Sequence, residues 1–254
     1  AQDAGEPFFK DVNKAGFDYY SFYMPMKGLK LGGGDRRKDR RKGDIAGSAN
    51  DSRSFWLDNI VAGRFRAGFG MGLVMNKGFS LGKSSMISSG GRISTGLSPH
   101  SSTSDENYLQ GAGVTFAYRP DKLKDRRTLS LSASLFGSSR YIDATITDSA
   151  TISTILTSAY HRTRNEINKK NSAVQSTFGG DVSMSYRQFS AGVTAVYTHL
   201  NTPLTPNKNP NKTTGADSYR LYYAEGCNFF NASVHYASKG SKLSFQGETA
   251  FAPK

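Results

Sequence analysis

The residue types that serve hydrolases and metal enzymes are all present in this chain of 254 residues. Its four histidines, His100, His161, His199 and His235, lack the HExxH spacing that binds zinc on one helix, and its single cysteine excludes a zinc cluster built on cysteine pairs. A serine nucleophile would need a histidine and an acid beside it, and no spacing here requires that they converge. We therefore expect no metal, no cofactor and no enzymatic activity.

A glycine-rich segment could in principle bind phosphate. Gly78 to Ser84 reads GFSLGKS and follows a strand-like run. A P-loop needs G-x-x-x-x-G-K-[ST] and then a helix whose N-terminus faces the phosphates. Here the spacing is one residue short, and the residues that follow read as a loop. We do not expect this segment to bind a nucleotide.

Cationic side chains give the chain a formal net charge of +13. The densest run, Asp35 to Lys42, could contact phosphates of lipopolysaccharide or of nucleic acid. We favour a solvated loop, because no aromatic side chain alternates with these charges to stack on bases. The residues that would make anion or phosphate contacts are Arg36, Arg37, Lys38, Arg40, Arg41, Lys42 and, outside the run, Lys83.

Two further arginines lie on the clearest structural element of the sequence. From Ile60 to Met75, alternate positions are all apolar or glycine, and the other set carries Arg64, Arg66 and three glycines. This period of two predicts a β-strand, longer than the roughly 9 to 11 residues with which a tilted strand crosses a bilayer. We expect the apolar set to face lipid and the two arginines to face inward.

Inward-facing charges could serve a barrel in either of two ways. Two arginines in a pore could set a preference for anions, or they could pair with interior acids such as Asp181 or Glu248, which is the simpler expectation for a narrow barrel. The glycines beside the arginines predict a close approach by something bulky, such as an inward loop or a plug. The residues expected to face the interior are Arg64, Arg66, Asp181, Arg187 and Glu248.

Other segments alternate in the same way, and no convincing amphipathic helix lies between them. No run approaches the roughly 18 apolar residues of a transmembrane helix, which excludes a helical membrane protein. A barrel strand needs only alternate residues to be apolar, so 37% hydrophobic residues suffice. The strand-like segments lie near residues 17–24, 60–75, 108–118, 128–135, 174–187, 189–198, 230–236 and 242–251.

The connections between these segments differ in length. Tight joints lie near 119–122, 186–189 and 237–240, and long polar loops span 25–53, 77–107, 140–171 and 201–218. Short turns on one side and long loops on the other are typical of outer-membrane barrels. We predict an all-β fold in one region, 1–254: an antiparallel transmembrane β-barrel of about eight strands, or a part of a larger barrel.

A soluble β-sandwich is the competing architecture, because its strands also alternate and number about seven. The strands predicted here are longer than a sandwich needs. The face opposite the apolar one is rich in serine, threonine, glycine and charge, which suits a wet interior. Aromatic side chains also lie near strand ends, where the interfacial belts of membrane proteins place them. These features favour the barrel.

Four stretches carry a family resemblance: residues 62–84, 104–116, 131–146 and 245–251. They resemble Bacteroidota outer-membrane proteins known as helix-hairpin-helix domain-containing proteins. The family pattern is a strand ending in a Gly-Gln-Gly-Leu-like turn, then a Gly-Lys segment, then an acidic pair before a strand. Gly82-Lys83 and Asp105-Glu106 match this pattern, whereas Gly70-Met71-Gly72-Leu73 has methionine in place of the glutamine.

The resemblance implies the barrel of such a protein without its helical repeats, and a piece of a larger barrel or a polypeptide cut at one or both ends. We expect a non-enzymatic protein of the bacterial outer membrane, an envelope pore or a component of an outer-membrane assembly. Its expected partners are lipid, lipopolysaccharide and other outer-membrane or periplasmic subunits. The alternatives are a channel for uptake or export of a polyanion such as DNA, and a soluble or surface β-sandwich adhesin.

Overall fold

The prediction of an all-β fold is confirmed. A computed structural model describes residues 22–33, 53–76, 96–100, 108–120, 129–147, 150–156, 161, 163–206, 224–240 and 244–253. Its strands are β1 (Tyr23–Gly33), β2 (Arg53–Gly68), β3 (Gly96–Pro99), β4 (Leu109–Pro120), β5 (Ser130–Ile146), β6 (Ile152–Leu156), β7 (Ala173–Tyr186), β8 (Phe189–Leu204), β9 (Gly226–Lys239) and β10 (Ser244–Phe251), and its one described helix is α2 (Arg164–Asn168). No helix in these ranges is long and apolar enough to cross a membrane.

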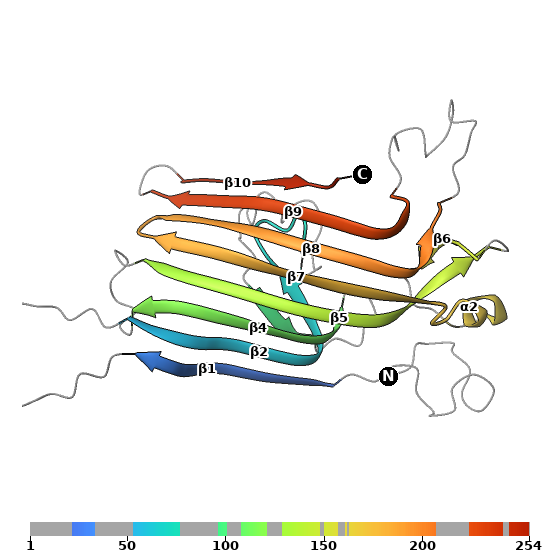
Figure 1. Cartoon of the computed structure of the whole chain (residues 1–254), viewed down its shortest axis with the longest axis horizontal. Coiled ribbons are helices and arrows are strands. Elements are labelled where there is room, and N and C mark those ends of the chain that lie inside the picture. The colour runs from blue at the N-terminus through green and yellow to red at the C-terminus, as the bar shows by residue number, and fades with distance from the viewer. Residues whose placement is uncertain are drawn as a thin grey trace, which may run out of the picture.

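All the strands belong to one sheet, and the longer ones form an antiparallel meander (Figure 1). Hydrogen-bonded neighbours follow the order β1-β2-β4-β5-β7-β8-β9-β10. The short strands lie off this path: β3 pairs with β2, and β6 pairs with the end of β5 and meets β8 at a parallel bridge between Ile152 and Leu204. Within the described residues β1 and β10 do not pair with each other, so the sheet has two edges.

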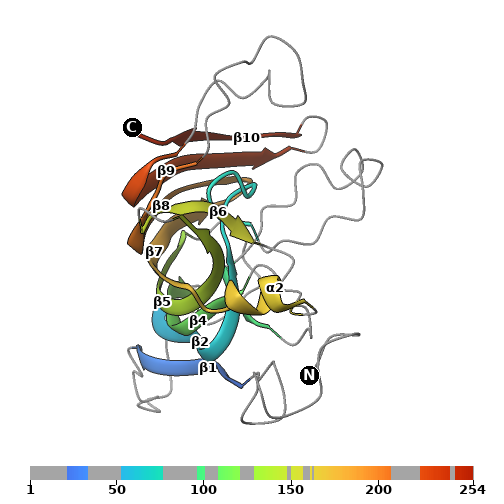
Figure 2. The same ribbon diagram turned by 90° about the vertical axis from the view of Figure 1, so that its right-hand side faces the viewer.

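Viewed along the strands the sheet is curved, and the last part of β2 runs along the inner side of the curve (Figure 2). Up to Gly63, β2 lies between β1 and β4, whereas Phe65 to Gly68 pair with β3. The bend falls at Gly63, whose φ of +94° suits glycine. A Cβ there would collide with the carbonyl oxygen of Phe22, which accepts a 2.8 Å hydrogen bond from the Arg64 N–H. We call residues 64–76 and 96–100 together the inner insert.

The expectation that the apolar set of β2 faces lipid is wrong. Val61, Phe65, Ala67 and Phe69 are buried inside the curve. Their cluster, which we call the inner apolar cluster, consists of Val61, Phe65, Ala67, Phe69, Leu97, Phe136 and Val196. Alternation separates the two faces of a strand but cannot tell a face that meets lipid from one that packs inside the protein. The strand also begins earlier than predicted, at Arg53. It ends earlier than predicted, at Gly68, because a turn with glycines at positive φ follows it.

The other long strands direct apolar side chains away from the inner apolar cluster, as their alternation predicts. We call this surface the outer apolar face. It gathers residues from every strand of the meander: Met24, Met26, Leu57, Ile60, Val114, Phe116, Leu131, Leu135, Phe178, Val182, Met184, Val193, Tyr197, Phe230, Val234, Tyr236, Phe245 and Phe251.

The four predicted long loops all contain some regular structure, so their predicted bounds are wrong, while many of their remaining residues lie outside the described part of the chain. Most of β1 falls in 25–53, β3 in 77–107, the end of β5 with β6 and α2 in 140–171, and the end of β8 in 201–218. β3, β6 and α2 have only four or five residues, too few to show a period. The tight turn predicted at 186–189 is present, with Tyr186 paired to Phe189.

Candidate functional site

Polar side chains cross the inner face of the sheet next to the inner apolar cluster. The strand register sets Thr115, Ser134, Asp181, Thr194 and Ser233 side by side on β4, β5, β7, β8 and β9. All five are buried, and the hydroxyls of Thr115 and Ser134 lie 2.9 Å apart. Buried polar groups need hydrogen-bond partners, and here Thr115 and Thr194 find theirs within the row, in Ser134 and Asp181, whereas Ser233 bonds to Glu248 on β10.

Asp181 is the charged member of this row. Its Oδ1 accepts a 2.8 Å hydrogen bond from the Thr194 hydroxyl and lies 2.8 Å from Nε2 of His235. An acid paired with an imidazole is two thirds of a hydrolase triad, but within the described residues the His235 ring makes no hydrogen bond to a hydroxyl group. The arrangement ties β7, β8 and β9 together.

Glu248 on β10 fastens the inner insert to the sheet. Its Oε1 accepts a 2.6 Å hydrogen bond from the Ser233 hydroxyl, and its Oε2 accepts from the backbone N–H groups of Met71 at 2.7 Å and Leu73 at 3.2 Å. A Cβ on Gly70 would lie 3.0 Å from the carboxylate oxygens. The glycine therefore lets the turn approach Glu248, as the glycine-rich face of this segment led us to expect.

Basic side chains gather around the ring of Tyr108. The Arg64 guanidinium lies 4.3 Å from the centroid of the Tyr108 ring, and that of Arg140 lies 4.8 Å from it. The ring of His100 stacks on Tyr108 with the two centroids 5.7 Å apart. Tyr108 and His100 are both buried. Guanidinium groups so close to a ring face gain from its quadrupole, more so where water is excluded.

The β2–β3 ribbon, formed by residues 64–68 and 96–100, has one basic face and one apolar face. The pairing places Arg64, Arg66, Ser98 and His100 on one face and Phe65, Ala67 and Leu97 on the other. The apolar face belongs to the inner apolar cluster. We call the opposite face the basic face. It therefore points away from that cluster.

Two of the five residues predicted to face the interior are acids that do not pair with the predicted arginines. Asp181 bonds to Thr194 and His235, and Glu248 bonds to Ser233 and to the backbone of the inner insert. Within the described residues no ion pair joins either acid to Arg64 or Arg66. The predicted pairing of these arginines with Asp181 or Glu248 is therefore wrong, and pairing with another interior acid stays a prediction.

Arg187 does not face the interior as predicted. It lies in the exposed turn between β7 and β8, with its guanidinium 5.3 Å from the ring of Tyr186. The alternation of β7 stops at Tyr186, one residue earlier. The other predicted anion contacts, Arg36, Arg37, Lys38, Arg40, Arg41, Lys42 and Lys83, lie outside the described residues, as does the segment Gly78 to Ser84.

The sequence did not predict which residues surround Arg64 and Asp181. Arg140 and Tyr108, like His235 and Thr194, come together only through the register of separate strands. The alternation of β5 was a weak indication that Arg140 faces the same side as the buried serines, since Ser134, Ser138 and Arg140 belong to one alternate set of this strand.

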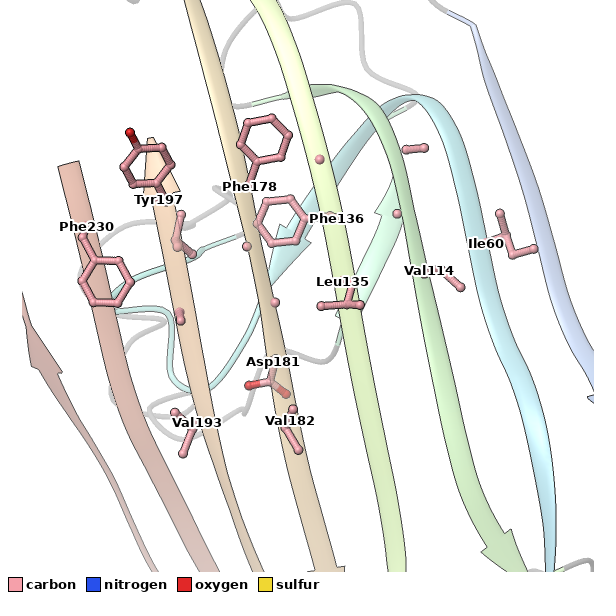
Figure 3. Close-up of a pocket in the computed structure, with 17 residues that line it drawn as sticks. Ile60, Val114, Leu135, Phe136, Phe178, Asp181, Val182, Val193, Tyr197 and Phe230 are labelled. Carbon is pink, nitrogen blue, oxygen red and sulfur yellow. The ribbon is translucent and has the colours of Figure 1, made fainter. Parts of the chain in front are cut away.

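An apolar depression of about 870 Å³ lies on the outer apolar face (Figure 3). Phe178, Tyr197 and Phe230 stand on one side of it, and Val182 and Val193 on the other. Small residues on the outer side form its floor: Ala112, Gly137, Gly180 and Ala195. Because almost no polar group lines it, nothing there would orient a polar ligand.

No group of three or more potential metal ligands occurs within the described residues. No protein-family model, no curated protein and no solved structure matches the chain.

Proposed function

We propose that this chain forms a section of the wall of an outer-membrane β-barrel together with the insert fastened inside it. Its role is non-enzymatic, as an envelope pore or a component of an outer-membrane assembly. The observation that carries the proposal is the outer apolar face, which continues across every strand of the meander. Soluble monomers rarely expose so extended an apolar surface, whereas a barrel in a bilayer needs one.

The lengths of the strands and of their connections support the proposal. β4, β5, β7, β8 and β9 have 12 to 17 residues, more than the roughly 9 to 11 that cross a bilayer. At one end of the meander three connections are short, and at the other end three are longer, the alternation that outer-membrane barrels show. The short ones are 121–129, 187–188 and 240–243, and the longer ones are 69–108, 147–172 and 205–225, with 34–52 as a longer connection at the short end.

The proposed barrel contains more strands than this sheet. An eight-stranded barrel is only wide enough inside for its own side chains, whereas the concave side of this sheet also holds the inner insert. The end strands β1 and β10 run in opposite directions, because an even number of antiparallel strands separates their outer edges. Each edge strand has one row of backbone groups without a partner strand among the described residues, so a further antiparallel strand can pair with it, from this polypeptide or from another subunit.

The proposal predicts that the folded chain depends on detergent and migrates differently in a gel before and after boiling. The protein would be refolded into micelles, and each sample would be run unheated and heated. A membrane barrel resists the gel detergent until it is heated, because its backbone hydrogen bonds are closed around the whole wall, which here requires that further strands of the polypeptide or of another subunit pair with β1 and β10 in the micelle. A chain that stays folded and monodisperse without detergent would instead be the soluble or surface adhesin, and the barrel would be wrong.

A further inference from the structure

We infer that the apolar depression on the outer apolar face holds one acyl chain of a membrane phospholipid, whose headgroup lies at a row of polar side chains next to it. The inference rests on the proposed function, since it needs the outer apolar face to lie against a bilayer. It adds that a lipid binds at one place on that face instead of covering it evenly.

The part of the depression over β7 and β8 is a groove between two walls of side chains (Figure 3). The strand register sets Gly180 beside Ala195 as its floor. Two residues further along each strand, in both directions, stand larger side chains that are exposed. They form an aromatic row, Phe178, Tyr197 and Phe230, and a valine pair, Val182 and Val193. The groove therefore crosses the strands and is open to whatever meets the outer apolar face.

The shape and lining of the groove suit one hydrocarbon chain better than a segment of protein. Its walls start four residues apart, at Phe178 and Val182 on β7, which is about 14 Å between Cα atoms, and their side chains fill part of that width. An α-helix with its side chains is about 10–12 Å across and does not fit. An extended peptide would place its backbone N–H and C=O groups against a surface with almost no polar group, which costs free energy. A methylene chain has no such groups.

A polar row borders the aromatic row on the side of the longer connections. It lies one step further along the same face and consists of Ser139, Ser176, His199 and Asn228. From the aromatic row the apolar face runs from Phe178 to Tyr186 on β7 and back from Tyr197 to Phe189 on β8. This is close to the roughly 9 to 11 residues with which a tilted strand crosses a bilayer. The polar row therefore lies where the proposed membrane meets water, and the groove lies just inside that border.

The hydrogen bonds of the polar row leave donors for a headgroup. Oδ1 of Asn228 accepts a 2.8 Å hydrogen bond from the Tyr197 hydroxyl and lies 2.7 Å from Nδ1 of His199. Among the described residues the side-chain N–H groups of Asn228 have no acceptor, so they can donate to a phosphate oxygen. Polar donors at the border and an apolar groove beneath them match the headgroup and the acyl chain of a phospholipid.

Photolabelling of the refolded full chain in detergent micelles tests the inference. The probe is phosphatidylcholine with a diazirine in the middle of one acyl chain, added in increasing amounts, and peptide mass spectrometry locates the labelled residues. We expect saturable labelling concentrated on residues 178–182 of β7 and 193–197 of β8, with little on the rest of the outer apolar face. The same lipid with the diazirine on its headgroup should label the polar row instead.

Ala195→Leu fills the floor of the groove, and Ala191→Leu is its matched control. Ala191 lies on the same face of β8, opposite Met184 and outside the depression. We expect the lipid concentration at half-saturation to rise at least about tenfold for Ala195→Leu, because each methylene group that loses its burial weakens binding several-fold. It should stay unchanged for Ala191→Leu. Circular dichroism would first show that both variants fold, and if Ala195→Leu does not, the labelling pattern of the unaltered chain decides.

The outcomes separate the groove from the proposed function. Labelling spread evenly over the outer apolar face, or an equal change in both variants, would overturn the groove and leave the proposed membrane surface in place. No labelling of that face in a folded chain would contradict the proposed function and the groove together. A dimer in micelles that Ala195→Leu alone dissociates would also overturn the inference, by identifying a second copy of the chain as the occupant.

Discussion

Replacing Asp181 with alanine is expected to lower the free energy of unfolding by about 3 to 5 kcal/mol, because removing one partner of a buried pair leaves the other unsatisfied. His235 would lose its only hydrogen-bond partner among the described residues, and the fully buried Thr194 hydroxyl would lose its acceptor. Urea unfolding of the refolded protein, followed by circular dichroism, measures the change.

Asp181→Asn is the matched variant, since it keeps the volume and an oxygen that accepts from both partners. Its expected cost is smaller, about 1 to 2 kcal/mol. A double-mutant cycle with His235→Ala isolates the pair, and we expect a coupling of at least about 1 kcal/mol. Additive effects of Asp181→Ala and His235→Ala would contradict the tie between β7 and β9.

Gly63→Ala is expected to destabilise the fold by on the order of 3 to 4 kcal/mol, through strain and a backbone collision together. The new Cβ would meet the carbonyl oxygen of Phe22, which cannot move away without breaking its hydrogen bond from Arg64. Because Gly63 is where β2 turns into the curve, the variant should also loosen the inner insert. Hydrogen exchange at the amides of Met71 and Leu73 would report this loosening.

Gly28→Ala provides the comparison for Gly63→Ala. Gly28 also has a positive φ, +73°, but nothing lies within 4 Å of where its Cβ would stand. Gly28→Ala should lower the free energy of unfolding only by the cost of placing a residue with a Cβ at positive φ, about 1 to 2 kcal/mol. Equal losses for the two variants would show that the close approach of β2 to Phe22 does not matter to the fold.

Alternation along the sequence was enough to predict seven of the eight strands of the meander, all but β1, and, for six of them, which side chains face outward. Strands β4, β5, β7, β8, β9 and β10 follow it. This works because the period of two is a local property of an extended chain. The turn at Arg187 and Gln188 followed for the same reason, since two alternating runs meet there.

The interior could not be predicted in this way, because its contacts join distant residues. The apolar set of β2 suits lipid and a buried core equally well, and the bend at Gly63 that decides between them depends on Phe22. Arg64 and Arg140 meet at Tyr108 through the register of three strands. Short elements such as β3 carry too few residues to show a pattern.

The outer apolar face is tested most directly by fluorescence quenching with brominated lipid. Trp56 is the single tryptophan of the chain, so Trp56→Phe gives a silent background for two variants, Phe178→Trp and Phe136→Trp. The two positions are offset by one residue in the pairing of β5 with β7 and lie on opposite faces, with Phe178 54% exposed and Phe136 6% exposed. Circular dichroism would first show that both variants fold.

In vesicles of dibromophosphatidylcholine, the proposed barrel predicts strong quenching of the tryptophan at position 178 and little at position 136, because bromine on the acyl chains reaches only residues that face lipid. Equal quenching at both positions, or none at position 178 in a folded protein, would contradict the claim that this face of the sheet lies against a membrane.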